Sequence, residues 1–66
     1  MKLTINGEIK EFTAQITLES MLEELHIKDQ VMAAAVNMQI VKQNEWVTYK
    51  LSDGDKIELL DFVGGG

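Results

Sequence analysis

The stretch MKLTINGEIKEFT, residues 1–13, determines how the fold begins. Residues 2–6 alternate polar and apolar side chains, with Leu3 and Ile5 on one face, which is typical of a β-strand. The pair Asn6-Gly7 favours a tight hairpin turn, because both residues tolerate a positive φ. The opening stretch therefore predicts two antiparallel strands joined by a two-residue turn.

The returning strand is expected over residues 8–13. Its phase is ambiguous, because Ile9 and Phe12 cannot both point inward on a regular strand. We predict that Phe12 faces the core and that Ile9 lies at a bulge or is partly exposed.

A helix is predicted to follow the hairpin. Thr17 is a suitable N-cap, and Glu19 is well placed for the first-turn dipole. Apolar residues then recur at helical spacing and form one stripe, Leu18, Met21, Leu22 and Leu25. The pattern fades around His26, which we interpret as a solvated residue near the helix end.

The middle of the chain predicts short elements. Residues 31–37 are expected to form a strand with three side chains on one face, Met32, Ala34 and Val36. A turn at residues 37–39 is expected to lead to a short strand over 40–42. Residues 43–46 are expected to form a single helical turn. Trp46 is expected to pack over an edge of the core; an interface position is the alternative.

The last strand is predicted over residues 56–63, after a turn at Asp53-Gly54-Asp55. Alternation along it places Ile57 and Leu59 on one face and Leu60 and Phe62 on the other. A hairpin, one covering helix and a late strand predict an α+β fold. The expected core comprises Leu3, Ile5, Phe12, Leu18, Met21, Leu22, Leu25, Val36, Ile57 and Leu59.

Length and charge limit the possible functions. The chain has 66 residues, no cysteine and a formal net charge of −5. A thiolate metal site is excluded, and nucleic acid is disfavoured because phosphate binding needs clustered Lys and Arg. We expect no metal, no cofactor bound by this chain, no signal peptide and no membrane span. These features predict a cytoplasmic protein.

The glycine run Gly64-Gly65-Gly66 is the most informative feature for function. Glycine has no side chain to pack and loses much backbone entropy on ordering, so such a run does not stabilise a domain. It does provide a narrow thread that presents a carboxylate. An α-carboxyl group ionises with a pKa of about 3.5, and the carboxylate is a poor electrophile until it is activated. The alternative is an inert terminus.

The whole chain resembles the ThiS family of sulfur carriers. The shared features are the Asn6-Gly7 hairpin, the helix opening at Thr17-Leu18, Trp46, the turn at residues 51–55 and the ending Phe62-Val63-Gly64-Gly65-Gly66. The resemblance implies a β-grasp, ubiquitin-like fold: a mixed sheet of four to five strands covered on one face by a single helix. Residues 1–63 would form this domain and residues 64–66 a flexible tail.

The resemblance also implies a role. A ThiF-like adenylyltransferase would activate the Gly66 carboxylate with ATP, and a cysteine desulfurase or another persulfide donor would convert it to a thiocarboxylate. A ThiG-like thiazole synthase would then take the sulfur for thiamine. The chain would be a co-substrate of these partners and not an enzyme.

The open face of the sheet is the expected docking surface for these partners. Leu60 and Phe62 point to it, and Val63, Gly64 and Gly65 lead from it to the reacting carboxylate of Gly66. Clustered apolar residues on an exposed face indicate docking, although isolated ones are common. Ala33 and Ala35 are expected to add a smooth strip to this face.

Three other functions remain open at this point. The small subunit of molybdopterin synthase uses the same thiocarboxylate chemistry, although it is longer. A ubiquitin-like modifier joined to target lysines has a similar fold and ending. A pure interaction domain with an inert tail is the third.

Overall fold

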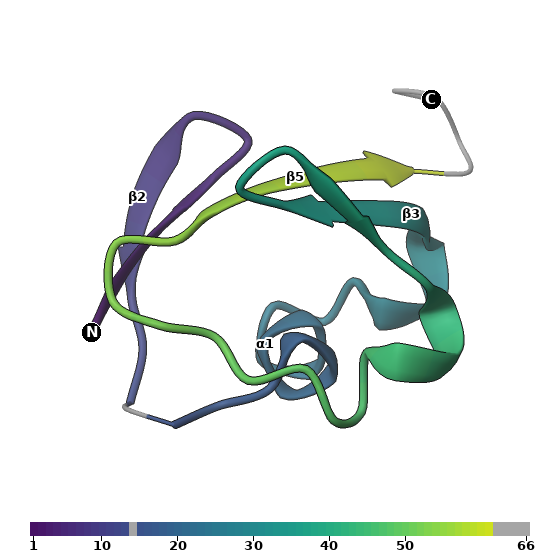
Figure 1. Cartoon of the computed structure of the whole chain (residues 1–66), viewed down its shortest axis with the longest axis horizontal. Helices are drawn as coiled ribbons and strands as arrows, with labels where there is room; N and C mark the ends of the chain where they lie inside the picture. The colour runs from purple at the N-terminus through teal and green to yellow at the C-terminus, as the bar shows by residue number, and fades with distance from the viewer. Residues whose placement is uncertain (14, 62–66) are drawn as a thin grey trace.

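A computed structural model describes residues 1–13 and 15–61 of the chain. The strands are β1 (Lys2–Ile5), β2 (Glu8–Glu11), β3 (Val31–Val36), β4 (Gln39–Val41) and β5 (Lys56–Asp61), and the α-helix is α1 (Leu18–Glu24). Two short 3₁₀ helices, η1 (Lys28–Gln30) and η2 (Gln43–Glu45), connect them. The predicted order of strands and helix is confirmed (Figure 1).

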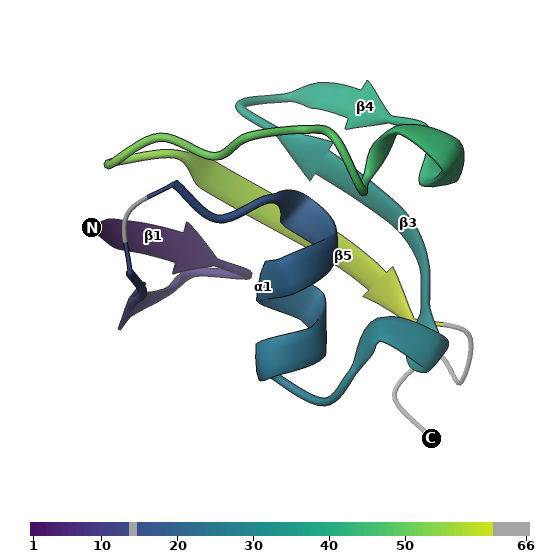
Figure 2. The same ribbon diagram turned by 90° about the horizontal axis from the view of Figure 1, so that it is seen from below.

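The strands form one mixed sheet in the order β2-β1-β5-β3-β4. The central pair β1–β5 is parallel, whereas β1–β2, β3–β4 and β3–β5 are antiparallel. Helix α1 lies on one face of this sheet and crosses in front of it in Figure 2. The predicted α+β architecture, one helix layer on one sheet face, is therefore confirmed.

Two-residue turns join both hairpins. Asn6 and Gly7 have φ values of 49° and 87°, and Asn37 and Met38 have values of 50° and 73°. Positive φ at both central residues is characteristic of the type I′ turn, whose twist matches that of the flanking strands. The first turn has the asparagine and glycine that this geometry favours, whereas the second places a methionine in a conformation that glycine adopts more easily.

Helix α1 begins and ends with recognisable caps. The Thr17 Oγ1 accepts a 3.1 Å hydrogen bond from the Ser20 amide, as predicted for an N-cap. At the other end His26 adopts a left-handed φ of 60°, and its amide and that of Ile27 donate to the Glu23 and Leu22 carbonyl oxygens. This pairing is the Schellman arrangement, so the helix stops where the apolar stripe fades.

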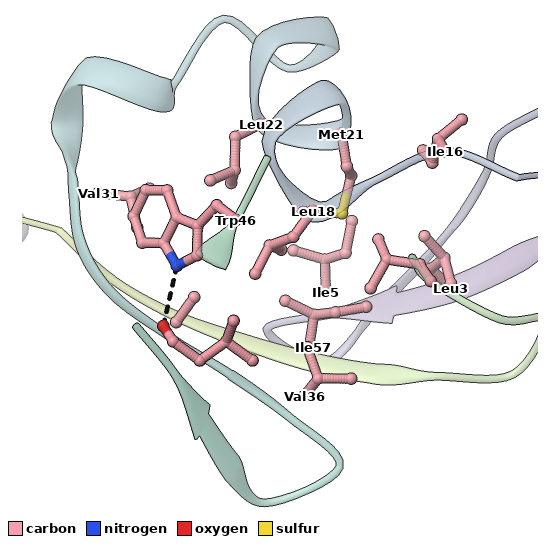
Figure 3. Close-up of a cluster of buried hydrophobic side chains, with 13 residues drawn as sticks. Leu3, Ile5, Ile16, Leu18, Met21, Leu22, Val31, Val36, Trp46 and Ile57 are labelled. Carbon is pink, nitrogen blue, oxygen red and sulfur yellow. Dashed lines mark hydrogen bonds between the residues drawn. The ribbon is translucent and has the colours of Figure 1, made fainter. Parts of the chain in front are cut away.

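One apolar core lies between α1 and the sheet (Figure 3). It comprises Leu3, Ile5, Ile16, Leu18, Met21, Leu22, Val31, Ala34, Val36, Val41, Trp46, Leu51 and Ile57, while Phe12, Leu25 and Leu59 are partly buried against it. Every residue of the predicted core therefore contributes. Trp46, 1% exposed, lies fully inside rather than over an edge or at an interface.

The prediction for Met32 is wrong. The pairing of β3 with β5 shifts between Val31 and Ala33, so Met32 is an extra residue with no partner in the ladder. A bulge reverses the alternation on either side of it. Val31 consequently faces the core together with Ala34 and Val36, and Met32 is exposed.

Strand boundaries also differ slightly from the predictions. β2 ends at Glu11, and Phe12 follows it as a half-buried residue, while Ile9 is exposed as expected. β5 is described to Asp61, so the predicted extension through residues 62 and 63 lies outside the described residues. No helix of the described part of the chain is long and apolar enough to cross a membrane.

Candidate functional site

The sheet face opposite α1 is the candidate docking surface. The register places Ala35 of β3 between Ile40 of β4 and Glu58 of β5, and it pairs Ala33 with Leu60. Side chains alternate across a sheet, so these residues share the face away from the core residues Ala34, Val41 and Ile57. None of the described elements covers this face in Figure 1.

This open face, defined by Ala33, Ala35, Ile40, Glu58 and Leu60, is mostly apolar. Leu60 is 57% exposed and Ile40 is 74% exposed, and a shallow hollow of about 210 Å³ lies among the five residues. The two alanines make its floor because their side chains are short and half-buried. Glu58 adds one carboxylate. The open face thus combines an exposed apolar surface with one acidic group.

The predicted position of Leu60 on the open face is confirmed, and so is the strip formed by Ala33 and Ala35. Ile40 was not predicted there. Neighbouring residues of a strand point to opposite faces, so a buried Val41 would have indicated that Ile40 lies on the open face. A strand of only three residues, however, gives too little periodicity to predict which residue is buried.

The remaining predicted site residues, Phe62, Val63, Gly64, Gly65 and Gly66, lie outside the described residues. The structure does define the strand that precedes them. β5 is the middle strand of the sheet, between β1 and β3, and its last described residue is Asp61. In the sequence, Leu60 is separated from Phe62 by one residue.

A second cluster of charged residues lies near the end of α1. Glu23, His26, Lys28, Asp29 and Gln30 surround an open hollow, and the Lys28 Nζ lies 3.7 Å from Glu23 Oε2. These side chains are largely in solvent, where such ion pairs contribute little. Within residues 1–13 and 15–61, no three His, Asp or Glu side chains are grouped so as to hold a metal ion. We assign no chemistry to this cluster.

Comparison with known proteins agrees with the fold and extends to the tail. The sequence profile described as the ThiS family matches residues 3–66. A sulfur carrier protein ThiS of Escherichia coli is 32% identical over 66 residues, which is the full length of both chains. The crystal structure of a thiamine biosynthesis protein (ThiS) from Geobacter metallireducens superposes with a TM-score of 0.83 at 26% identity, covering all of both chains. The expected β-grasp fold is thereby confirmed.

Two further relatives are much longer than this chain. A thiazole synthase of Paramagnetospirillum magneticum is 41% identical over 66 residues, and one of Magnetococcus marinus is 33% identical over 66 residues. The chain spans only 20% of the length of each. In these two proteins a segment similar to this chain is thus part of a polypeptide named for the synthase.

Proposed function

The chain belongs to the ThiS family, and from this membership we propose that it carries sulfur for the thiazole ring of thiamine. The observation that supports the proposal most directly is the full-length match to the E. coli sulfur carrier, which includes the glycine run. In this proposal Gly66 is the terminal residue and its carboxylate is the reacting group. The chain is then a co-substrate of its partners rather than an enzyme.

The chemistry follows from the weakness of a carboxylate as an electrophile. A carboxylate oxygen of Gly66 attacks the α-phosphorus of ATP on a partner adenylyltransferase, and pyrophosphate leaves. A persulfide of the donor then attacks the acyl carbon, and AMP leaves with the electron pair. A thiolate finally cleaves the resulting acyl disulfide, which leaves a thiocarboxylate on Gly66 and a disulfide on the donor side.

The chemistry explains why each partner protein is needed. ATP is bound by the adenylyltransferase, because this chain contains no glycine-rich phosphate loop followed by a helix. The sulfur donor is a cysteine desulfurase or another persulfide protein, because this chain has no cysteine of its own. Since both steps consume ATP or a protein persulfide, the cytoplasm is the proposed location of the reaction.

The proposed sulfur acceptor is a thiazole synthase. The two longer relatives support this partner, because joining a carrier to its acceptor in one polypeptide raises their effective concentration. The relatives' names favour thiamine over molybdopterin synthesis and over protein modification. The net charge of −5 suits a partner whose docking surface is basic.

The proposed docking surface is the open face, with Leu60 at its centre and the predicted residues Phe62, Val63, Gly64 and Gly65 completing the contact. The exposed apolar area at Leu60 and Ile40 supports it. Docking there would leave α1 and its charged face free in solvent.

Intact-mass measurement tests the proposed function. The chain is incubated with a ThiF-type adenylyltransferase, Mg-ATP and a persulfide donor, and the expected product has one oxygen replaced by sulfur. Omitting ATP is the control and should leave the mass unchanged. The loaded chain should then support thiazole formation by thiazole synthase. An unchanged mass in the complete mixture would contradict the proposal, and sulfur delivery only into molybdopterin formation would contradict its thiamine assignment.

A further inference from the structure

The two neighbours of β5 support it unequally. β3 pairs with β5 along its length, from Val36–Ile57 to Val31–Asp61. β1 pairs only with its first residues, at Thr4–Lys56 and Ile5–Ile57, and then turns away into the hairpin (Figure 2). Among residues 1–13 and 15–61, the second half of β5 therefore pairs with a strand on one flank only.

The side chain of Asn6 occupies that flank. Its Oδ1 accepts a 2.8 Å hydrogen bond from the Leu59 amide, and its Nδ2 donates a 3.4 Å bond to the Leu59 carbonyl oxygen. One amide side chain thus satisfies both backbone groups of Leu59, as a residue of a paired strand would. A primary amide has the donor and acceptor that this requires.

A matching contact exists near the start of β5. Asn37, in the other hairpin turn, accepts a 3.0 Å hydrogen bond from the Lys56 amide through its Oδ1, and its Nδ2 donates to Asp55 Oδ1 at 2.9 Å. Both asparagines have left-handed backbones, with φ values of 49° and 50°. The molecule therefore contains two similar contacts, one near each end of the same strand.

We propose that Asn6 is a positioning residue for the carboxylate chemistry. By holding the backbone of Leu59, it fixes the direction in which β5 leads toward the glycine run. This inference rests on the proposed function. A misplacement of about 1 Å at a reacting group can lower a rate about a hundredfold. Asn37 acts near the opposite end of β5, so its contact supports the fold without aiming the strand end.

The test compares Asn6→Gly with Asn37→Gly. Glycine keeps the positive φ of each turn, so the two variants share the same backbone change and each removes its own amide contacts. Steady-state ATP–pyrophosphate exchange is measured with a ThiF-type adenylyltransferase and Mg-ATP. For Asn6→Gly, kcat should fall about tenfold while KM changes less than about twofold, because docking is retained and alignment is impaired. Asn37→Gly should keep kcat within about twofold of the wild type.

Two further measurements separate positioning from general loss of structure. Hydrogen exchange of the Leu59 amide should accelerate in Asn6→Gly and remain slow in Asn37→Gly, because exchange reports local opening. Asn6→Asp retains the acceptor for the Leu59 amide and tolerates a positive φ, so its kcat should lie between those of the wild type and Asn6→Gly. If Asn6→Gly does not fold, Asn6→Asp replaces it in the comparison with the wild type.

The outcomes are distinct. Equal losses of kcat in the two glycine variants, or no loss in Asn6→Gly, would overturn the positioning role while leaving the carrier function intact. An Asn6→Asp variant as slow as Asn6→Gly would also overturn it, because the retained acceptor would then have no effect. No exchange with the wild-type chain would overturn the proposed function itself.

Discussion

The indole Nε1 of Trp46 donates a 2.9 Å hydrogen bond to the carbonyl oxygen of Val41 inside the core. Trp46 follows η2, and Val41 ends the edge strand β4. Both residues are buried, so this bond satisfies two polar groups that water does not reach. The bond connects the irregular segment after β4 to the sheet. The sequence of that segment has little hydrophobic periodicity.

Trp46→Phe should destabilise the domain by about 2–3 kcal/mol. The change removes this buried hydrogen bond and opens a small cavity in place of the indole. Urea unfolding followed by circular dichroism measures the loss. Val47→Ala, at an exposed neighbouring residue, is the control and should change stability by less than about 0.5 kcal/mol. Equal stability of the wild type and Trp46→Phe would show that the bond and the packing are dispensable.

Met38→Gly should stabilise the β3–β4 hairpin. Met38 is 82% exposed and has a φ of 73°, so it contributes little packing while its backbone is strained. Relief of a left-handed conformation is worth about 1 kcal/mol, of which the entropy of glycine cancels part. Thermal melting measures the gain, and Met38→Ala, which keeps a Cβ, should show none. A lower melting temperature for Met38→Gly would contradict the assignment of strain.

Gly54→Ala provides the reverse test. Gly54 has a φ of 88°, and a Cβ added there would meet no atom within 4 Å. Any cost therefore comes from backbone strain and not from a clash, and we expect about 1 kcal/mol of destabilisation. Chemical denaturation checks this value. An unchanged midpoint would mean that the turn relaxes without cost.

Leu60→Asp should weaken docking of the adenylating partner and leave the fold intact. Leu60 lies on the open face at 57% exposure, so an aspartate there remains in water and should cost less than about 1 kcal/mol of stability. We expect KM to rise while kcat changes little, because the Leu60 side chain serves binding and not the chemical step. Phe62→Asp is expected to act similarly, although Phe62 lies outside the described residues.

Ile57→Asp is the control on the opposite face of the same strand. Ile57 is 0% exposed, and an unpaired carboxylate there should cost several kcal/mol and unfold the domain. Melting and binding are measured on both variants. If Leu60→Asp unfolded the protein as Ile57→Asp does, the open face would not be a free surface.

The sequence predicted elements that have strong local signals. The Asn6-Gly7 turn, the Thr17 cap and the apolar stripe of α1 each depend on residues close together in the chain, and each is confirmed. Leu60 could be placed on the open face because alternation along β5 is regular. Because these local signals identify the strands and the helix and their order, the α+β architecture could be predicted without knowledge of long-range contacts.

The errors and omissions arise where packing partners are distant. The bulge at Met32 is set by the register against β5, which the sequence of β3 alone does not encode. Leu51 and Ile16 are core residues without local periodicity; the Leu51 amide donates to the Ile16 carbonyl oxygen at 3.0 Å across a loop pairing. Asn6 was recognised as a turn residue, but its contact with Leu59 spans 53 positions. Such a contact is visible only in the folded chain.

Deleting Gly66 should abolish sulfur loading without unfolding the domain. The buried core of the described residues ends at Ile57, and stability should therefore change by less than about 0.5 kcal/mol. Removing one residue withdraws the carboxylate by about 3.5 Å, well beyond the roughly 1 Å misplacement that costs a hundredfold in rate. The new terminus is still a glycine carboxylate, so only its reach differs. Intact mass after incubation with the adenylyltransferase, ATP and persulfide donor measures the loss.

Gly64→Ala separates the length of the thread from its width. An added methyl group disturbs the fit in a narrow partner channel but keeps the carboxylate at its distance, so we expect a milder loss of loading than from the deletion. Melting curves of both variants should match that of the wild type, because neither change reaches the described core. If the shortened chain gained a thiocarboxylate at a near-normal rate, Gly66 would not be the positioned reactant. The carboxylate of Gly65 would then accept sulfur as readily as that of Gly66, and the length of the thread would not set the rate of loading.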